Sequence, residues 1–114
     1  MAVKPSRAWA KGAAFVKLVA DYLHETWGYE VMVRAKGEQG DDMLVAELSR
    51  ISFEVKCQDS IDLAGWMKQA KDQAGSRRYP VVVHKRRARG AAEDQWVTME
   101  LGSFVRMLEE FINS

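Results

Sequence analysis

The sequence predicts a single α/β domain: a central mixed sheet of five strands flanked by helices, in the order α-β-β-β-α-β-β-α. Apolar residues recur every three or four positions near both ends and in the middle of the chain, which is typical of helices. Short runs with alternating or continuous apolar residues lie between these segments and indicate strands. A chain of 114 residues can bury one core without disulfides or a structural metal, so we expect one domain over residues 1–114.

The composition is that of a soluble globular protein and argues against several classes of function. The formal net charge of +1 argues against a generic nucleic-acid coat, although it allows local basic patches. Cys57 is the only cysteine, so an intrachain disulfide is impossible and a reducing cytoplasm is the expected setting. With two histidines and one cysteine, we do not expect a zinc site. No apolar run reaches about 18 residues, so we do not expect membrane insertion.

A first helix is expected over residues 9–27, after a loose basic leader at residues 1–7. Its apolar residues follow spacings of three and four and form one long stripe. The stripe consists of Trp9, Ala13, Val16, Ala20, Leu23 and Trp27, widened by Phe15, Val19 and Tyr22. Gly28 is expected to cap this helix, and a strand follows at residues 29–34. We assign the two tryptophans to core packing or a subunit interface rather than to base stacking.

Residues 40–56 predict a hairpin of two short strands joined by a polar turn at about residues 47–50. In each strand, residues of one parity are apolar. These residues are Leu44, Ala46 and Leu48 in the first strand, and Ile51, Phe53 and Val55 in the second. A turn of two or four residues places both sets on one face, which should be the buried face.

The same register places Asp41 on the opposite face, together with Glu54 and Lys56. A turn of odd length would pair Asp42 with Glu54 instead, but it would mix the two apolar sets. We therefore prefer Asp41 as the partner of Glu54. Neighbouring side chains on paired strands lie about 5 Å apart and diagonal ones about 7–8 Å apart, so two such carboxylates can share a cation.

Two carboxylates and an ammonium on one side of a hairpin favour phosphodiester chemistry. Hard divalent ions such as Mg²⁺ take oxygen ligands, and one held by Asp41 and Glu54 would activate a water and stabilise the leaving oxygen. Lys56 would then neutralise the charge that builds on the attacked phosphate. Glu38, in the loop before the hairpin, is a further candidate ligand. The alternative is that Glu54 and Lys56 are solvated residues on an exposed sheet face.

A second helix is expected over residues 61–74, with Asp59 or Ser60 as its N-cap. Its apolar side consists of Leu63, Trp66, Met67 and Ala70. Gln69 lies near that side and is either a solvated residue or part of the site. Gln73 is a weaker candidate for the same role.

The remaining elements are a buried strand at residues 79–84, a last strand at residues 95–101 and a final helix. His84 is expected to be a strand residue with its own hydrogen-bond partner rather than a catalyst. Ser103 is expected to cap the final helix. The apolar residues of that helix are Phe104, Val105, Leu108, Phe111 and Ile112.

Basic residues are concentrated on both sides of the strand at residues 79–84. Charge runs are commonly solvated loops, but Lys and Arg placed along a DNA path bind phosphates without reading sequence. We favour DNA contact for the group formed by Lys85, Arg86, Arg87 and Arg89. Further candidates for DNA contact are Arg77, Arg78 and Lys11.

This order of motifs resembles the PD-(D/E)XK nuclease superfamily, with Asp41 as the isolated acid and Glu54-Val55-Lys56 as the acid-x-lysine motif. Over roughly residues 11–108 the chain resembles the small phage- and archaeal-type Holliday junction resolvases, especially the phage-type ones. The other matching segments are Lys11-Gly12, Val19-Ala20-Asp21-Tyr22-Leu23, Gly28-Tyr29, Gly40-Asp41, Leu63-Ala64-Gly65-Trp66, Gln69-Ala70 and Val81-Val82-Val83-His84-Lys85. The resemblance depends on motif order and compact length together, and no single segment is specific.

The resemblance implies a restriction-endonuclease-like fold and a Mg²⁺- or Mn²⁺-dependent endonuclease that cuts four-way DNA junctions in recombination or repair. It implies a homodimer, because paired incisions need two equivalent sites, and host cytoplasm as the location if the chain is phage-encoded. The implied metal ligands are Asp41, Glu54 and the backbone carbonyl of Val55, with Asp42 and Glu38 as further candidates. It also places Gln69 near the metal or the scissile phosphate.

One position departs from the pattern of the resolvases. They carry a glutamate in the first helix that helps complete the metal site, and Val16 stands closest to the matching place. Either Glu38 or Asp42 substitutes for it, one metal is bound weakly, or the chain binds junctions but cuts poorly. Two other functions therefore stay open: a non-catalytic DNA-binding module, and a restriction- or repair-type nuclease acting on duplex or single-stranded DNA.

Overall fold

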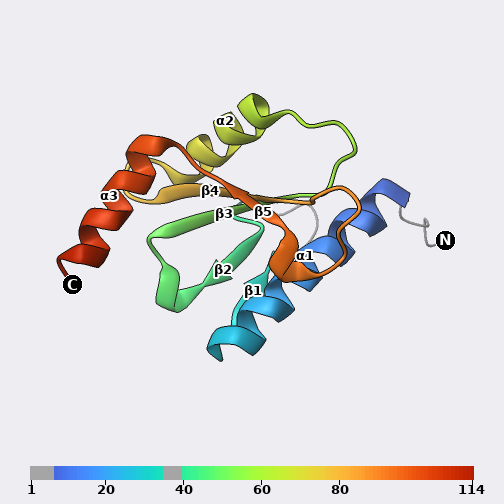
Figure 1. The fold of residues 1–114 in the computed structure, drawn as a ribbon, viewed down its shortest axis with the longest axis horizontal. Coiled ribbons are helices and arrows are strands. Elements are labelled where there is room, and N and C mark those ends of the chain that lie inside the picture. The colour runs from blue at the N-terminus through green and yellow to red at the C-terminus, as the bar shows by residue number, and fades with distance from the viewer. Residues whose placement is uncertain (1–6, 35–39) are drawn as a thin grey trace.

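A five-stranded sheet runs through the centre of the described part of the chain (Figure 1). The computed structural model describes residues 7–34 and 40–114, without the side chains of residues 7–10. The helices are α1 (Arg7–Trp27), α2 (Leu63–Ala74) and α3 (Leu101–Ile112), with short 3-10 helices η1 (Ala46–Leu48) and η2 (Ala92–Asp94). The strands are β1 (Val31–Val33), β2 (Met43–Val45), β3 (Ile51–Lys56), β4 (Tyr79–His84) and β5 (Trp96–Thr98). The predicted fold class and element order are confirmed.

The sheet has the strand order β1-β2-β3-β4-β5 and is mixed. β3 and β4 are parallel, with Glu54 opposite Val82, and α2 makes the connection between them. The other neighbouring strands are antiparallel. Because side chains alternate between the faces of a strand, this arrangement sends consecutive β3 residues to opposite layers of the molecule.

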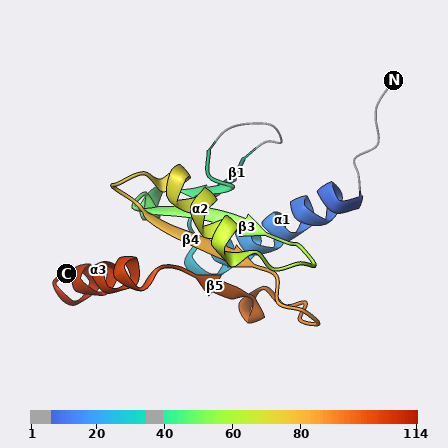
Figure 2. The same cartoon turned by 90° about the horizontal axis from the view of Figure 1, so that it is seen from above.

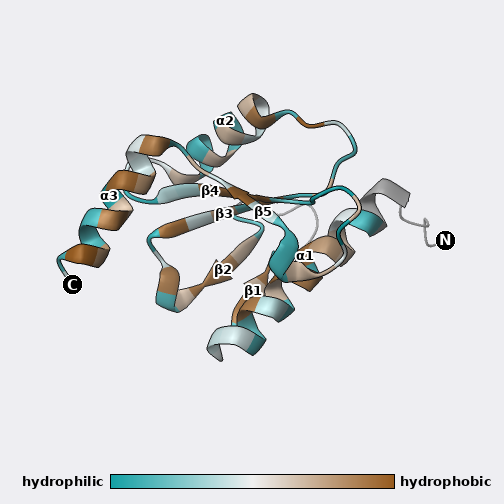
Figure 3. Ribbon diagram, in the orientation of Figure 1, coloured by the Kyte–Doolittle hydropathy of each residue, from teal (hydrophilic) through white to brown (hydrophobic). Residues whose placement is uncertain are grey.

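The helices α1 and α2 cover opposite faces of the sheet (Figures 1 and 2). The larger core lies on the α1 side, where Phe53, Val55, Val81 and Val83 pack with Met43, Val45, Phe15, Val19 and Ala20. On the α2 side, Val82 packs against Trp66 and Ala70. The α1 interface is therefore apolar, whereas Val82 on the α2 side has the buried polar residues Glu54 and His84 as neighbours on the strands. Figure 3 shows hydrophobic stretches on the inner strands.

The predicted register of the hairpin is wrong. Met43 lies opposite Phe53, so Met43 and Val45 share the buried face with Phe53, whereas Leu44 is 48% exposed. The physical reason is that residues 46–48 leave the strand and form η1, so that apolar alternation does not continue through them. The connection is thus of odd length, which is the alternative that pairs Asp42, rather than Asp41, with Glu54.

Several helix boundaries differ from the predictions. Arg7 belongs to α1, and the rest of the predicted leader, residues 1–6, lies outside the described residues. The N-cap of α2 is Asp62 rather than Asp59 or Ser60, because its Oδ1 accepts the Gly65 amide at 3.0 Å. α3 begins at Leu101 after Glu100, so Ser103 lies inside the first turn and does not cap it. Its buried hydroxyl instead accepts a hydrogen bond from Arg106 at 3.3 Å.

The buried side of α1 is narrower than the predicted stripe. Phe15, Val19 and Ala20 are buried, whereas Ala13 is exposed and Trp27 is 48% exposed beside Tyr29. The side chain of Trp9 lies outside the described residues. Gly28 does end the helix, as predicted: it adopts φ +76° and donates its amide to the His24 carbonyl at 2.7 Å. Among the described helices, none combines the length and apolar character needed to cross a bilayer.

Candidate functional site

The candidate site lies where β2 and β3 separate. Immediately before β2, the Asp42 amide donates to the Phe53 carbonyl at 3.1 Å, and the Asp42 Oδ2 accepts the Val55 amide at 2.7 Å. The Asp42 carboxylate thus accepts the hydrogen bond of a β3 amide that would otherwise pair with the backbone of the neighbouring strand. It thereby holds β2 and β3 apart at this point. Gly40 precedes the acids with φ +125°, a conformation that favours glycine.

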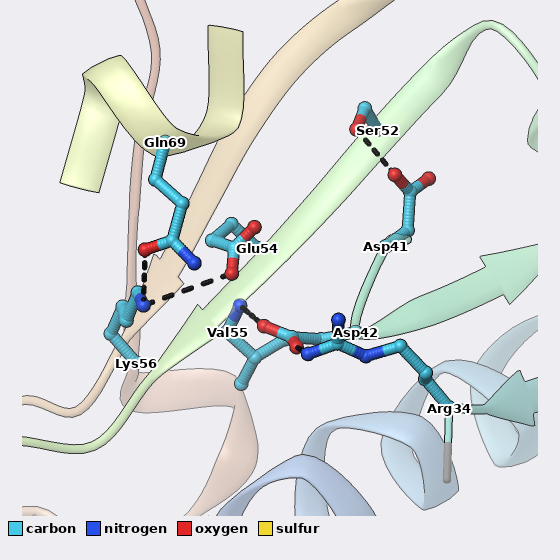
Figure 4. Close-up of polar contacts among 8 residues, drawn as sticks. All are labelled: Arg34, Asp41, Asp42, Ser52, Glu54, Val55, Lys56 and Gln69. Carbon is cyan, nitrogen blue, oxygen red and sulfur yellow. Dashed lines mark hydrogen bonds and ion pairs between the residues drawn. The ribbon is translucent and has the colours of Figure 1, made fainter. Parts of the chain in front are cut away.

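Glu54 and Lys56 point from β3 toward α2, on the face opposite the larger core (Figure 4). The Lys56 Nζ lies 3.7 Å from Glu54 Oε1 and donates to Gln69 Oε1 at 2.7 Å. The side chains of Glu54 and Lys56 are only 4% and 15% exposed. The ammonium is therefore held between a strand carboxylate and a helix amide. Gln69 thus lies beside Lys56, and its role at a metal or phosphate site stays a prediction.

Arg34 is a member of the site that the sequence did not indicate. It follows β1, and its Nη2 lies 2.6 Å from Asp42 Oδ1. Asp42 is thus held on one oxygen by Arg34 and on the other by the Val55 amide. The sequence contains only a weak signal for Arg34, because a basic residue at the end of a predicted strand is usually solvated. Its ion pair with Asp42 depends on the pairing of β1 with β2.

Asp41 does not join this group, and its preferred assignment as the partner of Glu54 is wrong. Figure 4 shows its carboxylate turned toward Ser52, away from Glu54. The Ser52 hydroxyl donates to Asp41 at 2.7 Å, and Arg78 donates through two nitrogens at 2.6 and 3.2 Å. Arg78 also donates to the carbonyls of Ala74 and Gln73. Asp41 therefore ties the start of β2 to the end of α2, which is a structural role.

The surroundings of Glu54 disfavour its ionisation. Burial, followed by the neighbouring Asp42 carboxylate, raises the pKa of Glu54 to about 7, although Lys56 and Arg34 act in the opposite direction. Two carboxylates that resist being charged together form a site that a proton or a cation can stabilise. The electrostatics therefore favour positive charge between Asp42 and Glu54.

The donor chemistry fits a hard divalent cation. Asp42 and Glu54 offer carboxylate oxygens, and Val55, between Glu54 and Lys56, offers a backbone carbonyl, which stays a predicted ligand. In the described part of the chain, three or more acids, histidines or cysteines do not gather into one group. An ion held here would therefore keep several waters, as Mg²⁺ usually does.

Two further positions bear on the ligand set: Val16, where the resolvase glutamate is missing, and Glu38, a predicted ligand. Val16 is partly buried and packs against the larger core, so the first helix supplies no carboxylate at that position. Glu38 lies outside the described residues. Asp42 is thus the acid that stands beside Glu54.

The predicted DNA-contacting residues fall into two groups at opposite ends of β4. At its start, Arg77 is exposed, whereas Arg78 is committed to Asp41. At its end, Arg87 and Arg89 are exposed, and Arg86 lies over the Trp96 ring at 5.2 Å. The Lys85 ammonium donates to the carbonyls of Arg86 and Arg89, and Lys11 pairs with Asp59 at 3.1 Å.

His84, between these groups, is a buried strand residue as predicted. Its Nε2 lies 2.7 Å from the Thr98 hydroxyl, and burial lowers the pKa of the imidazole.

Comparison with known proteins adds no further assignment: the chain matches no described family, no curated protein and no solved structure. The geometry of Asp42, Glu54, Lys56 and Gln69 is therefore the basis for a function.

Proposed function

We propose that this protein is a metal-dependent DNA endonuclease that hydrolyses phosphodiester bonds in branched DNA, with a four-way junction as its substrate. The observation that carries the proposal is the convergence of Asp42, Glu54 and Lys56 where β2 separates from β3. The acid-x-lysine motif thus has an acid beside it, as the resemblance to PD-(D/E)XK nucleases requires. That acid is Asp42 rather than Asp41.

Each residue of the site has a distinct task under this proposal. Asp42 and Glu54 hold Mg²⁺ or Mn²⁺, which when bound supplies activation of water and stabilisation of the leaving oxygen. Lys56 neutralises charge on the attacked phosphate, and Gln69 fixes the position of the ammonium through its 2.7 Å hydrogen bond. The Val55 amide and Arg34 hold the Asp42 carboxylate in one orientation.

A catalytically weak DNA-binding module of the same fold is the competing function. Two observations favour it: Val16 supplies no carboxylate, and Arg34 forms a 2.6 Å ion pair with Asp42 that a metal would have to share or displace. Such a module would bind junctions and leave them intact. Calorimetry with MgCl₂ and MnCl₂ separates the two functions, because the weak module would take up neither ion.

A panel of DNA substrates tests the proposed activity. With 10-fold excess enzyme, Mg²⁺ should support cleavage of a four-way junction at least about tenfold faster than that of a flap or a linear duplex of the same sequence. EDTA should abolish the cleavage. Equal rates on all three substrates would indicate a restriction- or repair-type nuclease, and binding without any cleavage would indicate the DNA-binding module.

A homodimer is part of the proposal, and the outer face of α3 is the surface that supports it. α3 extends from the body of the molecule, at one end in Figures 1 and 2. Its apolar side chains follow helical spacing and are 39–77% exposed. These are Leu101, Phe104, Val105, Leu108, Phe111 and Ile112. With about 100 Å² of exposed apolar surface per side chain, this face presents about 600 Å². That is close to the roughly 800 Å² that each partner contributes to a standard interface.

Charge placed on this face should therefore separate the subunits. Phe111→Glu together with Leu101→Glu should convert a dimer into a monomer, measured by light scattering after gel filtration at about 50 μM protein. Exposed Glu47, on η1, provides a control: Glu47→Lys should leave the mass unchanged. A wild-type chain that is monomeric at this concentration would contradict the assignment of α3 as the interface.

A further inference from the structure

A concave surface next to the candidate site contains an exposed tryptophan among basic residues. The cavity measures about 450 Å³ and lies at the carboxyl ends of β3 and β4, beside the start of β5. Its wall includes Cys57, Lys85 and Trp96, with Lys11 contributed by α1. The volume is within the usual range of small-ligand sites, about 300–1,000 Å³.

The charge of this cavity favours an anionic ligand. Lys11, Lys85, Arg86 and Arg87 line it, and Asp59 is the one acid among the described lining residues. Asp59 already pairs with Lys11, at 3.1 Å. Basic side chains therefore clearly outnumber acidic ones around the cavity. A phosphate group bound here would meet a strongly positive surface.

Trp96 gives the cavity an aromatic surface as well as a charge. The residue is 51% exposed, although it belongs to a strand. The guanidinium of Arg86 lies 5.2 Å from the centre of the ring, and the His84 ring meets the indole nearly perpendicularly, at 6.2 Å between centroids. The indole is thus supported from within the fold and half exposed, with the Arg86 guanidinium over its ring. A nucleobase can stack on the exposed part of the indole or on the planar guanidinium.

The cavity is directly linked to the candidate site through the strands. Cys57 follows Lys56 in the chain, and the Lys85 amide donates to the Lys56 carbonyl at 3.0 Å. A DNA strand with a phosphate at Lys56 would therefore bring one of its neighbouring nucleotides to Trp96. A base in a continuous duplex is stacked on both sides, so stacking on the indole requires an unpaired base.

We propose that this cavity binds an unpaired nucleotide of the DNA strand next to the phosphate at Lys56. Its base stacks on Trp96, and its phosphate contacts Lys11 and Arg87. The inference rests on the proposed function, because it takes DNA as the ligand. It adds that the substrate is recognised through a base displaced from the helix, and it assigns to Trp96 the role of stacking platform.

Binding measured without divalent metal tests this inference separately from catalysis. The probes are an 8-nucleotide single strand and a matched duplex, each with one 2-aminopurine, titrated in EDTA. Trp96→Ala should weaken binding of the single strand by about tenfold or more, and it should remove the 2-aminopurine quenching on binding. Trp96→Phe should retain most of both. Duplex affinity should change by less than about twofold in either variant.

One further variant controls for the loss of an exposed indole elsewhere, and another tests the proposed phosphate contact. Trp27→Ala removes a similarly exposed indole on α1, and it should leave single-strand affinity unchanged. Arg87→Gln alters an exposed side chain, and it should reduce the salt dependence of binding by about one phosphate contact.

Equal losses for both probes in Trp96→Ala, or no loss for either, would overturn the inference. Specific single-strand binding without junction cleavage would instead reject the nuclease and leave the cavity assignment standing. Cleavage that survives Trp96→Ala with unchanged quenching would reject the cavity assignment and leave the nuclease.

Discussion

Asp42→Asn should reduce Mg²⁺-dependent cleavage by at least about 100-fold while leaving the fold intact. The physical reason is that Asp42 places a carboxylate beside Glu54, and the amide of asparagine cannot supply the negative charge that holds a divalent cation. Asparagine keeps an oxygen that can accept the Val55 amide, so the separation of β2 from β3 should persist. Single-turnover cleavage of a labelled four-way junction provides the measurement, and thermal unfolding reports on the fold.

Asp41→Asn is the matched comparison, and it should act mainly on stability. Its side chain is 2% exposed and is bound by Arg78 and Ser52, so neutralising it leaves the Arg78 guanidinium without its carboxylate. We expect a loss of about 2–4 kcal/mol in the free energy of unfolding, measured with urea. Below the unfolding transition, cleavage should fall less than in Asp42→Asn. A stable Asp41→Asn protein without activity would restore Asp41 as the metal ligand.

The stability of the metal-free protein should decrease as the pH rises from about 4.5 to 7. Glu54 has its pKa raised to about 7 from 4.5, so across this window the folded state binds the proton that the unfolded state has lost. Each pH step upward then favours unfolding, and the loss reaches about 3 kcal/mol once the pH exceeds 7. Urea denaturation between pH 4.5 and 8.5 measures the slope.

Glu54→Gln should remove this dependence, because glutamine has no proton to lose. At pH 8 and without divalent ions, the variant should therefore be more stable than the wild type, although it should not cleave DNA. Adding Mg²⁺ at pH 8 should stabilise the wild type and not the variant. Glu47→Gln, at an exposed position on η1, should keep the wild-type slope. A wild-type slope in Glu54→Gln would show that another group carries the effect.

The elements and the acid-x-lysine motif could be predicted from local sequence. Glu54 and Lys56 alternate with Phe53 and Val55, and a period of two determines that these pairs face opposite sides of any strand. Helical periodicity placed Gln69 near the apolar side of its helix, and only the resemblance implied a place for it at the site. Gly28 ends its helix for a local reason, namely the freedom of glycine to adopt positive φ.

The choice between Asp41 and Asp42 could not be made in this way, because both acids lie outside the regular strand. Which of them faces Glu54 depends on how residues 46–50 close the connection between β2 and β3. Residues 46–48, of which Ala46 and Leu48 are apolar, form η1 instead of extending the strand, and that shifts the register by one. The partners of the acids, Arg34 and Arg78, come from other elements, and their contacts exist only after the strands and α2 have assembled.

The sequence by itself thus determined the α/β class, the order of helices and strands, and the face of β3 that carries Glu54 and Lys56, because these depend on periodicities within one segment. Only the tertiary structure decided which aspartate stands beside Glu54, which arginines hold the two acids, and that Trp96 opens onto a basic cavity. These features depend on register and on contacts between distant segments, where one residue of displacement exchanges the buried and exposed faces of a strand.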